Sequence, residues 1–253
     1  RRHTRSFHVT GVQTCALPIW EVHATFQAVA GEYSGRWFDE FFKKDDTDAE
    51  RRAERLWEKA RAESIVAECQ GKPGIATEES KPTTQLSPLL FDLTSLQREA
   101  NGRFGFSARA TLGLAQALYE KHKVLTYPRT DSRALPEDYL STVKETMQEF
   151  VGGKKGEEAS TYAPFARQIL RQGWVRPNKR IFDDKKISDH FAIIPTLQMP
   201  RQLNEAEAKI YDMVVRRFLA VFYPAAEFLQ TTRITVVEKH HFRTEGKVLV
   251  NPG

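Results

Sequence analysis

The stretch LTYPRTDSR, residues 125–133, places a tyrosine hydroxyl beside two arginines and an aspartate. A phenol ionises near pH ~10, so at neutral pH it attacks an electrophile only where nearby positive charge or a base favours its oxyanion. Arg129 and Arg133 can supply that charge, and a guanidinium can donate two hydrogen bonds to the non-bridging oxygens of a phosphodiester under attack. The stretch therefore predicts that Tyr127 is a nucleophile acting on a phosphodiester.

The same residues also permit a purely structural interpretation. Pro128 forces the residue before it to be extended, so Tyr127 could end a short buried strand over residues 124–126, followed by a solvated turn. Upstream, apolar side chains recur on one face from Ser107 to about His122, which predicts a helix. A helix followed by a strand indicates a winged-helix-like unit around Tyr127.

Two longer blocks of sequence resemble type IA DNA topoisomerases. Residues 91–139, FDLTSLQREANGRFGFSARATLGLAQALYEKHKVLTYPRTDSRALPEDY, resemble the nucleophile-bearing region of that family. Residues 188–196, SDHFAIIPT, are similar to its histidine motif. The proline after the tyrosine and the SDHFAIIPT block look more like bacterial topoisomerase III than topoisomerase I.

The resemblance implies a set of roles for these residues. Tyr127 would attack the DNA backbone and become linked to a 5′ phosphate, and the released 3′ hydroxyl would later reverse the step without ATP. Arg129 would position the scissile phosphate, and His190 would hydrogen-bond a phosphate or assist proton transfer. Thr130 and Asp131 are expected to hold Arg129 and its loop in place. The expected DNA contacts are Gln97, Thr130, Asp131, Arg133 and Ser188.

The family also implies Mg²⁺, bound by a DxDxE cluster, a glutamate and a lysine in a Toprim domain that we expect to lie outside this chain. The letters Asp46-Thr47-Asp48-Ala49-Glu50 match DxDxE, but Lys43 and Lys44 precede them and a charged helix is expected to follow. Acidic residues in a first helical turn are explained by capping and the helix dipole. We therefore expect no metal ligands in this chain, and we expect the chain alone to be unable to relax DNA.

The composition is compatible with a folded, DNA-binding protein. The 253 residues include 40% hydrophobic residues, which is ample for a packed core, and the net charge is +5. Without Arg1, Arg2 and Arg5 of the N-terminal tail, that excess is modest for a DNA-binding protein, so contact with DNA should depend on a local group of cations. These cations are Arg98, Arg103, Arg109, Lys121, Lys123, Arg129 and Arg133. The expected partner is single-stranded or negatively supercoiled DNA, and the expected protein is a monomer of the cytoplasm, in the bacterial nucleoid.

Other features of the sequence argue against several protein classes. Cys15 and Cys69 form no CxxC pair, so neither a zinc ribbon nor a disulfide framework is expected. No apolar run approaches the ~18 residues that a membrane span needs, so no membrane association is expected. No P-loop pattern occurs, in agreement with resealing without ATP.

The pattern predicts a mixed α+β fold. The resemblance implies a strand-rich arch with an inserted helical, winged-helix-like tyrosine domain, as part of a toroidal core. Residues 1–19 look like translated vector or adapter sequence and are expected to be non-native, and the chain is expected to be cut at both ends. The expected domains are residues 20–85 (first part of the arch), 86–200 (tyrosine domain), 201–224 (connecting helix) and 225–253 (returning strands).

Local patterns predict the individual elements. Strands are expected at residues 21–30, 35–42, after Pro73-Gly74, at 228–237 and at 246–250, with the strand at 228–237 pairing with those near residues 21–42. Helices are expected at residues 50–69, capped by Thr47 and Glu50, after Pro136, and from Asn204 and Glu207 to Pro224. Residues 81–84 and 152–158 are expected to be loops, and Arg216 and Arg217 to lie on a solvated helix face.

Two other classes of protein stay open on the sequence. One is a non-catalytic module that binds single-stranded nucleic acid and uses Tyr127 only to stack on bases. A Tyr127→Phe change separates this class from an enzyme, because stacking survives loss of the hydroxyl. The other is a tyrosine recombinase or relaxase, which needs arginines and histidines in a different order or a histidine-rich metal site. The only close histidine pair, His240-His241, is far from Tyr127 in the sequence.

Overall fold

The chain forms two compact units in a computed structural model that describes residues 2–13, 18–43, 48, 50–152 and 160–253. Unit 1 comprises residues 1–84 and 227–252, and unit 2 comprises residues 85–226 with Gly253. Unit 2 is thus inserted between two stretches of unit 1. Over the described ranges, no helix is both long and apolar enough to cross a bilayer.

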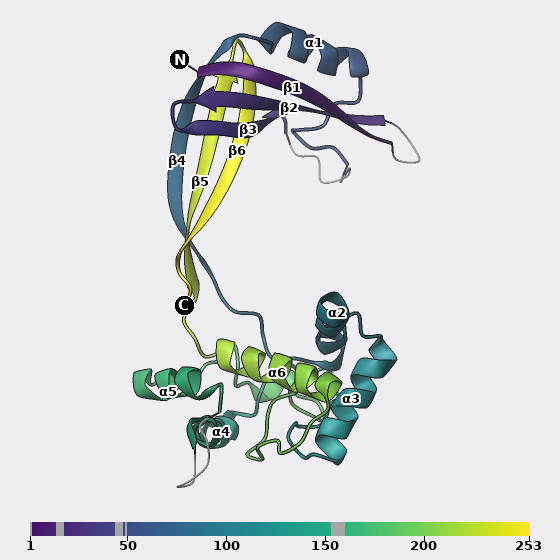
Figure 1. Cartoon of the computed structure of the whole chain (residues 1–253), viewed down its shortest axis with the longest axis vertical. Helices are drawn as coiled ribbons and strands as arrows, with labels where there is room; N and C mark the ends of the chain where they lie inside the picture. Colours follow the sequence, from purple (N-terminus) through teal and green to yellow (C-terminus); the bar gives the residue numbers. More distant parts are fainter. Residues whose placement is uncertain (1, 14–17, 44–47, 49, 153–159) are drawn as a thin grey trace. The chain divides into compact units, whose positions relative to one another are not determined.

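Unit 1 contains a sheet whose six described strands follow the order β1-β2-β3-β6-β5-β4 (Figure 1). Pairs Arg2–Gly74 and His3–Pro73 between β1 and β4 close the sheet. Gly74 lets β4 approach β5 closely, because a Cβ at this position would lie 2.9 Å from Thr235 Cγ2. The strands are β1 (Arg2–Gln13), β2 (Pro18–Ala28), β3 (Gly31–Phe38), β4 (Pro73–Gln85), β5 (Ala226–Val237) and β6 (His240–Asn251).

The core of unit 1 lies between the strands and helix α1 (Lys59–Cys69), which packs against β1 and β2 (Figure 1). Strand residues enter this core at every second position, as the pleat requires. Helix residues enter it at intervals of three and four, which is the spacing of one helical face. The buried side chains are Val22, Ala24, Phe26, Trp37, Ala62, Ile65, Cys69, Val237 and Phe242.

The strands predicted at residues 21–30 and 35–42 are confirmed as β2 and β3, and the strand after Pro73-Gly74 is confirmed as β4. β4 continues to Gln85, so the loop predicted at residues 81–84 is wrong. The predicted helix start at Glu50 is also wrong. Leu56 exchanges two backbone hydrogen bonds with Trp20, at 2.8 and 2.9 Å, and this bridge keeps the chain out of a helix until Lys59. Thr47, the predicted cap, lies outside the described residues.

One strand was not predicted, and one strand prediction needs correction. No element was predicted within residues 1–19, but β1 pairs with β2 from His3 to Gln13; the non-native origin of residues 1–19 stays a prediction. The strand predicted at residues 228–237 is confirmed as β5, but its pairing is wrong. β5 turns at Glu238, which has a φ of 53°, into β6, and β6 is the strand that pairs with β3.

Unit 2 is mainly helical and has one large apolar core. Its helices are α2 (Leu93–Phe104), α3 (Ala108–Glu120), η1 (Glu137–Tyr139), α4 (Leu140–Gly152), α5 (Ala163–Gln172), η2 (Asp184–Lys186) and α6 (Glu205–Ala220) (Figure 1). Side chains of α2, α3, α4, α5 and α6 all enter this core. The predicted connecting helix of residues 201–224 therefore belongs to the core of unit 2.

The helices predicted from Ser107, after Pro136 and from Asn204 are confirmed as α3, α4 and α6, whereas α2 and α5 were not predicted. The strand predicted at residues 124–126 is wrong, because only a single bridge joins Leu125 to Pro195. Gly152 ends α4, and residues 153–158 of the predicted loop lie outside the described residues.

The prediction of a solvated face on α6 holds for Arg216 but not for Arg217. Arg216 is exposed and pairs with Asp212, one turn earlier. The side chain of Arg217 is only 14% exposed, forms an ion pair with Glu99, and lies over the ring of Phe91 at 4.1 Å. Arg217 is therefore a structural residue of unit 2.

Candidate active site

The segment that leads to Tyr127 is fixed along the predicted histidine block. α3 ends at Glu120, and the chain turns at Lys123, which has a φ of 58°. The Thr126 amide donates to the carbonyl of Ile194 at 3.0 Å, and its hydroxyl donates to the carbonyl of Ala192 at 2.9 Å. These hydrogen bonds hold the residues before Tyr127 against the histidine block, as the predicted strand would have done, although no strand forms there.

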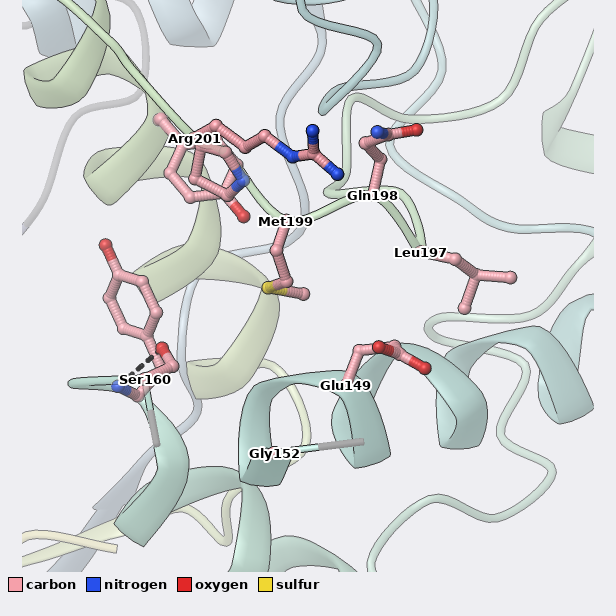
Figure 2. Close-up of a pocket in the computed structure, with 10 residues that line it drawn as sticks. Glu149, Gly152, Ser160, Leu197, Gln198, Met199 and Arg201 are labelled. Atoms are coloured by element: carbon pink, nitrogen blue, oxygen red, sulfur yellow. Dashed lines mark hydrogen bonds between the residues drawn. The ribbon is translucent and has the colours of Figure 1, made fainter. Parts of the chain in front are cut away.

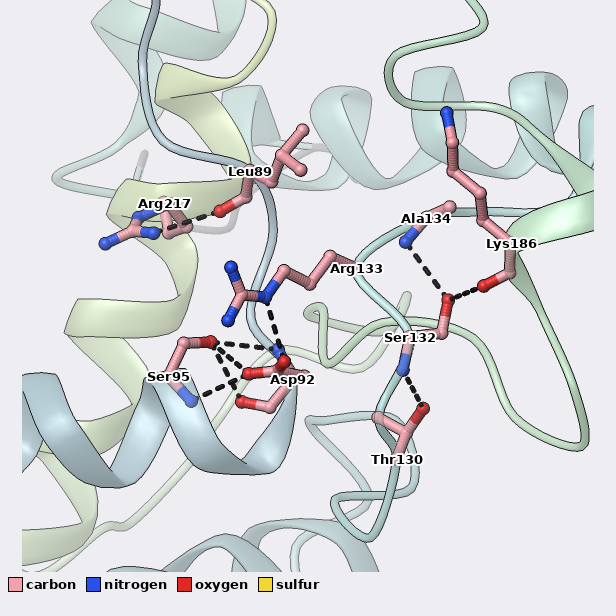
Figure 3. A network of polar contacts seen from close by, with 9 residues as sticks. All are labelled: Leu89, Asp92, Ser95, Thr130, Ser132, Arg133, Ala134, Lys186 and Arg217. Atoms are coloured by element: carbon pink, nitrogen blue, oxygen red, sulfur yellow. Dashed lines mark hydrogen bonds and ion pairs between the residues drawn. The ribbon is translucent and has the colours of Figure 1, made fainter. Parts of the chain in front are cut away.

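The segment that follows Tyr127 is fixed to the same block. The buried Thr130 hydroxyl donates to the carbonyl of His190 at 2.8 Å. It also accepts from the Ser132 amide at 3.1 Å (Figure 3). The carbonyl of Thr130 accepts from the Leu93 amide at 3.0 Å, at the start of α2. Residues 127–129 therefore form a short loop that is held at both ends.

The ring of Tyr127 lies between two other aromatic rings. Its centroid is 4.3 Å from that of His190, and it meets Tyr119 of α3 edge-on at 5.4 Å. Tyr127 is half-buried and His190 is exposed. No described residue hydrogen-bonds the Tyr127 hydroxyl. This arrangement holds the phenol ring while leaving its oxygen open to a substrate, beside an imidazole able to take or give a proton.

Arg129 is held by Gln116 of α3. With the amide oxygen of Gln116 turned toward Arg129, that oxygen accepts from Nε and from Nη2 at 3.1 Å each. Thr130 and Asp131 were predicted to hold Arg129 and its loop. Thr130 holds the loop, whereas the partner of Arg129 is Gln116, and Asp131 accepts a long 3.5 Å hydrogen bond from Ser188. Arg129 is exposed, so its remaining donors can reach a ligand.

Arg133 is held by Asp92, the N-cap residue of α2 (Figure 3). Its Nε donates to Asp92 Oδ2 at 2.8 Å, and the Ser95 amide donates to Asp92 Oδ1 at 2.7 Å. Burial opposes the charged carboxylate, but the hydrogen bonds from Ser95 and Arg133 outweigh it and lower the pKa of Asp92. The charge of Arg133 is thus compensated within the protein.

The other predicted DNA contacts lie on α2, on α3 and in the turn after α3. Gln97 donates from Nε2 to the carbonyl of Ala108 at 3.1 Å and so joins α2 to α3. Arg103 pairs with Glu99, and Lys123 Nζ lies 5.5 Å from the centre of the Tyr119 ring. The cations that are exposed on these elements are Arg98, Arg103, Arg109, Lys121 and Lys123.

The residues around Tyr127 do not fit a Mg²⁺ site. Hard cations need several oxygen ligands that converge on one point, and Asp92 and Asp131 are already engaged by Arg133 and Ser188. Across the described ranges, no three histidine, cysteine, aspartate or glutamate side chains gather in such a cluster. The Asp46–Glu50 letters lie partly outside these ranges, and Glu50 pairs with Arg55.

Unit 2 also has a cavity of about 640 Å³ that is separate from these residues (Figure 2). None of the predicted site residues lines it. Its wall includes Met199, Arg201 and the ring of Tyr211, whose hydroxyl is buried and has no hydrogen-bond partner among the described residues. Because that hydroxyl has almost no accessible surface, it does not offer a ligand contact in the cavity.

Comparison with known proteins gives consistent matches. A family model described as DNA topoisomerase matches residues 15–253. DNA topoisomerase 3 of Bacillus cereus is 42% identical over 202 residues, which is 79% of this chain and 27% of that protein. DNA topoisomerase 3 of Bacillus subtilis is 40% identical over 192 residues, which is 75% of this chain and 25% of that protein. The chain thus spans about a quarter of the length of these curated relatives.

A solved structure shares the fold. Full-length topoisomerase I from Thermotoga maritima aligns with 86% of this chain and 32% of that one, with a TM-score of 0.53. The sequences are 18% identical, so this likeness bears on the fold alone. It agrees with the predicted mixed fold, in which a strand-rich part carries an inserted helical part of a type IA core.

Proposed function

The chain belongs to the type IA DNA topoisomerase family and is topoisomerase III-like, and from this premise we propose that it cuts one DNA strand by transesterification at Tyr127. The observation that carries the proposal is the contact of Tyr127 with His190 at 4.3 Å. The hydrogen bonds of Thr126 and Thr130 fix this contact on both sides of the nucleophile. A base-stacking tyrosine would need no such partner.

In the proposed step, the Tyr127 oxygen forms a bond to phosphorus and the bond from phosphorus to the 3′ oxygen breaks. The phenol loses one proton and the departing 3′ oxygen gains one, so no net proton is consumed. His190 is placed to hold or relay that proton. The products are a 5′-phosphotyrosine and a free 3′ hydroxyl. Because one phosphodiester replaces another, attack by the 3′ hydroxyl on the phosphotyrosine reseals the strand without ATP.

Arg129 stabilises the negative charge that gathers on the non-bridging oxygens of the attacked phosphate. A donor aimed at such charge contributes ~10²–10³ in rate. Arg129 suits this role because it is exposed, two residues from Tyr127, and held by a neutral partner.

The remaining contacts bind and orient the DNA strand. Gln97, Asp131, Arg133 and Ser188 contact DNA in this proposal. Thr130, which is buried and bonded to His190, keeps the loop in place. The substrate is single-stranded or negatively supercoiled DNA, the protein acts as a monomer in the cytoplasm, and strand passage follows cleavage.

If Mg²⁺ takes part in this reaction, its carboxylate ligands would come from outside these residues, as the family's Toprim domain would supply them. The engagement of Asp92 and Asp131 in other contacts supports this part of the proposal. The chain alone is then expected to bind DNA but not to relax a supercoiled plasmid.

The proposal is tested with a single-stranded oligonucleotide whose linkages carry sulfur in place of the bridging 3′ oxygen. A thiolate leaves without the protonation that an alkoxide needs, so the assay reports attack by Tyr127 even when the metal site is missing. A label at the 3′ end should become covalently attached to the protein, and a label at the 5′ end should be released with the thiol. Attachment of the 5′ label contradicts the proposed polarity. Tight binding with no attachment of either label favours a non-catalytic single-strand-binding module.

A further inference from the structure

One face of α3 supports both groups of the proposed reaction. Gln116 and Tyr119 are three residues apart and so lie on the same side of the helix. Gln116 holds the Arg129 guanidinium, and Tyr119 meets the Tyr127 ring edge-on. Both contacts arise from one turn of a helix that packs against α2 and α6, so the guanidinium and the phenol are placed relative to each other by a rigid element.

The contact with Gln116 occupies only one edge of the Arg129 guanidinium. A guanidinium has five N–H donors in a planar fork, and the Gln116 oxygen accepts from Nε and from Nη2. The two Nη1 donors and the second Nη2 donor have no partner among the described residues. These donors form the end of the fork, which matches two oxygens of a phosphate.

The two arginines of the LTYPRTDSR stretch are held by partners of different charge. Arg133 is bound by the carboxylate of Asp92, whereas Arg129 is bound by the neutral amide of Gln116. A carboxylate compensates the charge of its arginine, but an amide fixes the orientation of the group and leaves its full positive charge for a substrate. Arg129, the arginine nearer to Tyr127 in the sequence, is therefore the one that has a neutral partner.

We propose that Gln116 is a positioning residue that orients Arg129 toward the scissile phosphate without neutralising it. This inference rests on the proposed function of Tyr127, since a guanidinium needs such orientation only if it must meet a phosphate at that site. Without Gln116, the exposed Arg129 side chain samples many rotamers and must be ordered when the substrate binds.

The hydrogen bond itself is tested by NMR on the whole chain, with the Arg129 Nε–H resonance assigned through an Arg129→Lys variant. A hydrogen bond to the side chain at position 116 should slow exchange of this proton with water, both in the wild-type chain and in Gln116→Glu. Gln116→Leu, which removes the amide acceptor and keeps an uncharged side chain, should restore fast exchange. Gln148→Leu, on the exposed side of α4, is the matched control and should behave as wild type. Equal exchange in wild type and Gln116→Leu overturns the proposal.

The role in cleavage is tested by the rate of covalent attachment to the 3′-thio oligonucleotide. Gln116→Leu should lower this rate ~10- to 100-fold, the loss typical of a misplaced catalytic group. Gln116→Glu should also lower it although the hydrogen bond remains, because a carboxylate neutralises Arg129. If Gln116 were needed only for folding, Gln116→Glu would not keep the hydrogen bond to Arg129 and yet lose the rate of attachment.

A double-mutant cycle completes the test. In an Arg129→Ala background, Gln116→Leu should have no further effect, since Gln116 acts through Arg129. Independent, multiplicative losses overturn the proposal. Normal attachment in Gln116→Leu overturns the role of Gln116 while leaving Tyr127 as the nucleophile. Absence of attachment in the wild-type chain overturns the proposed function and, with it, the role of Gln116 in cleavage.

Discussion

The ring of Tyr127 lies 4.3 Å from the ring of His190, measured between centroids, although the two residues belong to separate sequence motifs. The backbone explains why they meet. Thr126 bonds Ala192 and Ile194 before the tyrosine, and Thr130 bonds the carbonyl of His190 after it. The tyrosine motif and the histidine motif are therefore one structural unit, stabilised largely by threonine hydroxyls.

Arg217 should contribute far more to stability than its neighbour Arg216. Arg217 donates to the carbonyl of Leu89 at 2.9 Å (Figure 3). It also pairs with Glu99, and burial lowers its pKa. Arg217→Met should lower the free energy of unfolding by about 2 kcal/mol, because it leaves the carbonyl and the carboxylate without this donor. Urea unfolding followed by circular dichroism measures the loss.

Arg216→Met is the matched control for that measurement. It removes only an exposed pair with Asp212 on the same helix and should cost less than about 0.5 kcal/mol. Equal losses in the two variants would show that Arg217 is not the structural residue inferred from its burial.

Asp92 should make the stability of unit 2 depend on pH. Its pKa in the folded protein is below the ordinary value, so its contribution is complete above the pKa of the unfolded chain and is lost as pH falls through the folded-state value. Asp92→Asn keeps an N-cap side chain but loses the charge that pairs with Arg133. The difference in unfolding free energy between wild type and Asp92→Asn should therefore be largest near pH 7 and should shrink toward pH 2.5. A difference that is constant with pH contradicts this role.

Cys69 should be unreactive in the folded protein. It is completely buried in the core of unit 1, and this burial raises the pKa of its thiol to about 12. The thiolate is the reactive form, and an ordinary thiol ionises near pH ~8.5. In a Cys15→Ser chain at pH 8.5, alkylation by iodoacetamide should be at least ~100-fold slower without urea than in unfolding urea. Similar rates in both conditions would mean that Cys69, at the end of α1, is not buried against the strands of unit 1.

Local signals predicted the helices that carry their own caps. Ser107 caps α3, and Asn204 with Glu207 forms a capping box on α6, so both elements could be located from residue types alone. The two helices that were not predicted carry the same kind of signal: Asp92 and Ser95 form a capping box on α2, and α5 has a proline in its first turn and Gly173 as its C-cap.

Other elements depend on contacts between distant residues, which local patterns do not contain. The start of α1 is set by the bridge between Leu56 and Trp20. The burial of Arg217 depends on Phe91 and Glu99, which come from another part of unit 2.

The candidate site was also predicted only in part, because some of its residues lie in recognisable motifs and others depend on contacts between distant residues. Tyr127, Arg129 and His190 were predicted as site residues from their motifs, and the structure brings Tyr127 and His190 into contact. Gln116 was missed because nothing in the local pattern says which side of α3 faces Arg129. Its spacing from Tyr119 on a helix that leads to the nucleophile was the one available signal.

The most direct test of the central claim compares three chains in the covalent attachment assay: wild type, Tyr127→Phe and Tyr119→Phe. Both variants lose one hydroxyl and keep the aromatic ring, and the two rings are in contact at 5.4 Å, so they differ mainly in which oxygen is removed. We expect attachment of the 3′-labelled fragment to wild type and Tyr119→Phe, and none to Tyr127→Phe. Attachment to Tyr127→Phe at the wild-type rate would contradict the assignment of Tyr127 as the nucleophile.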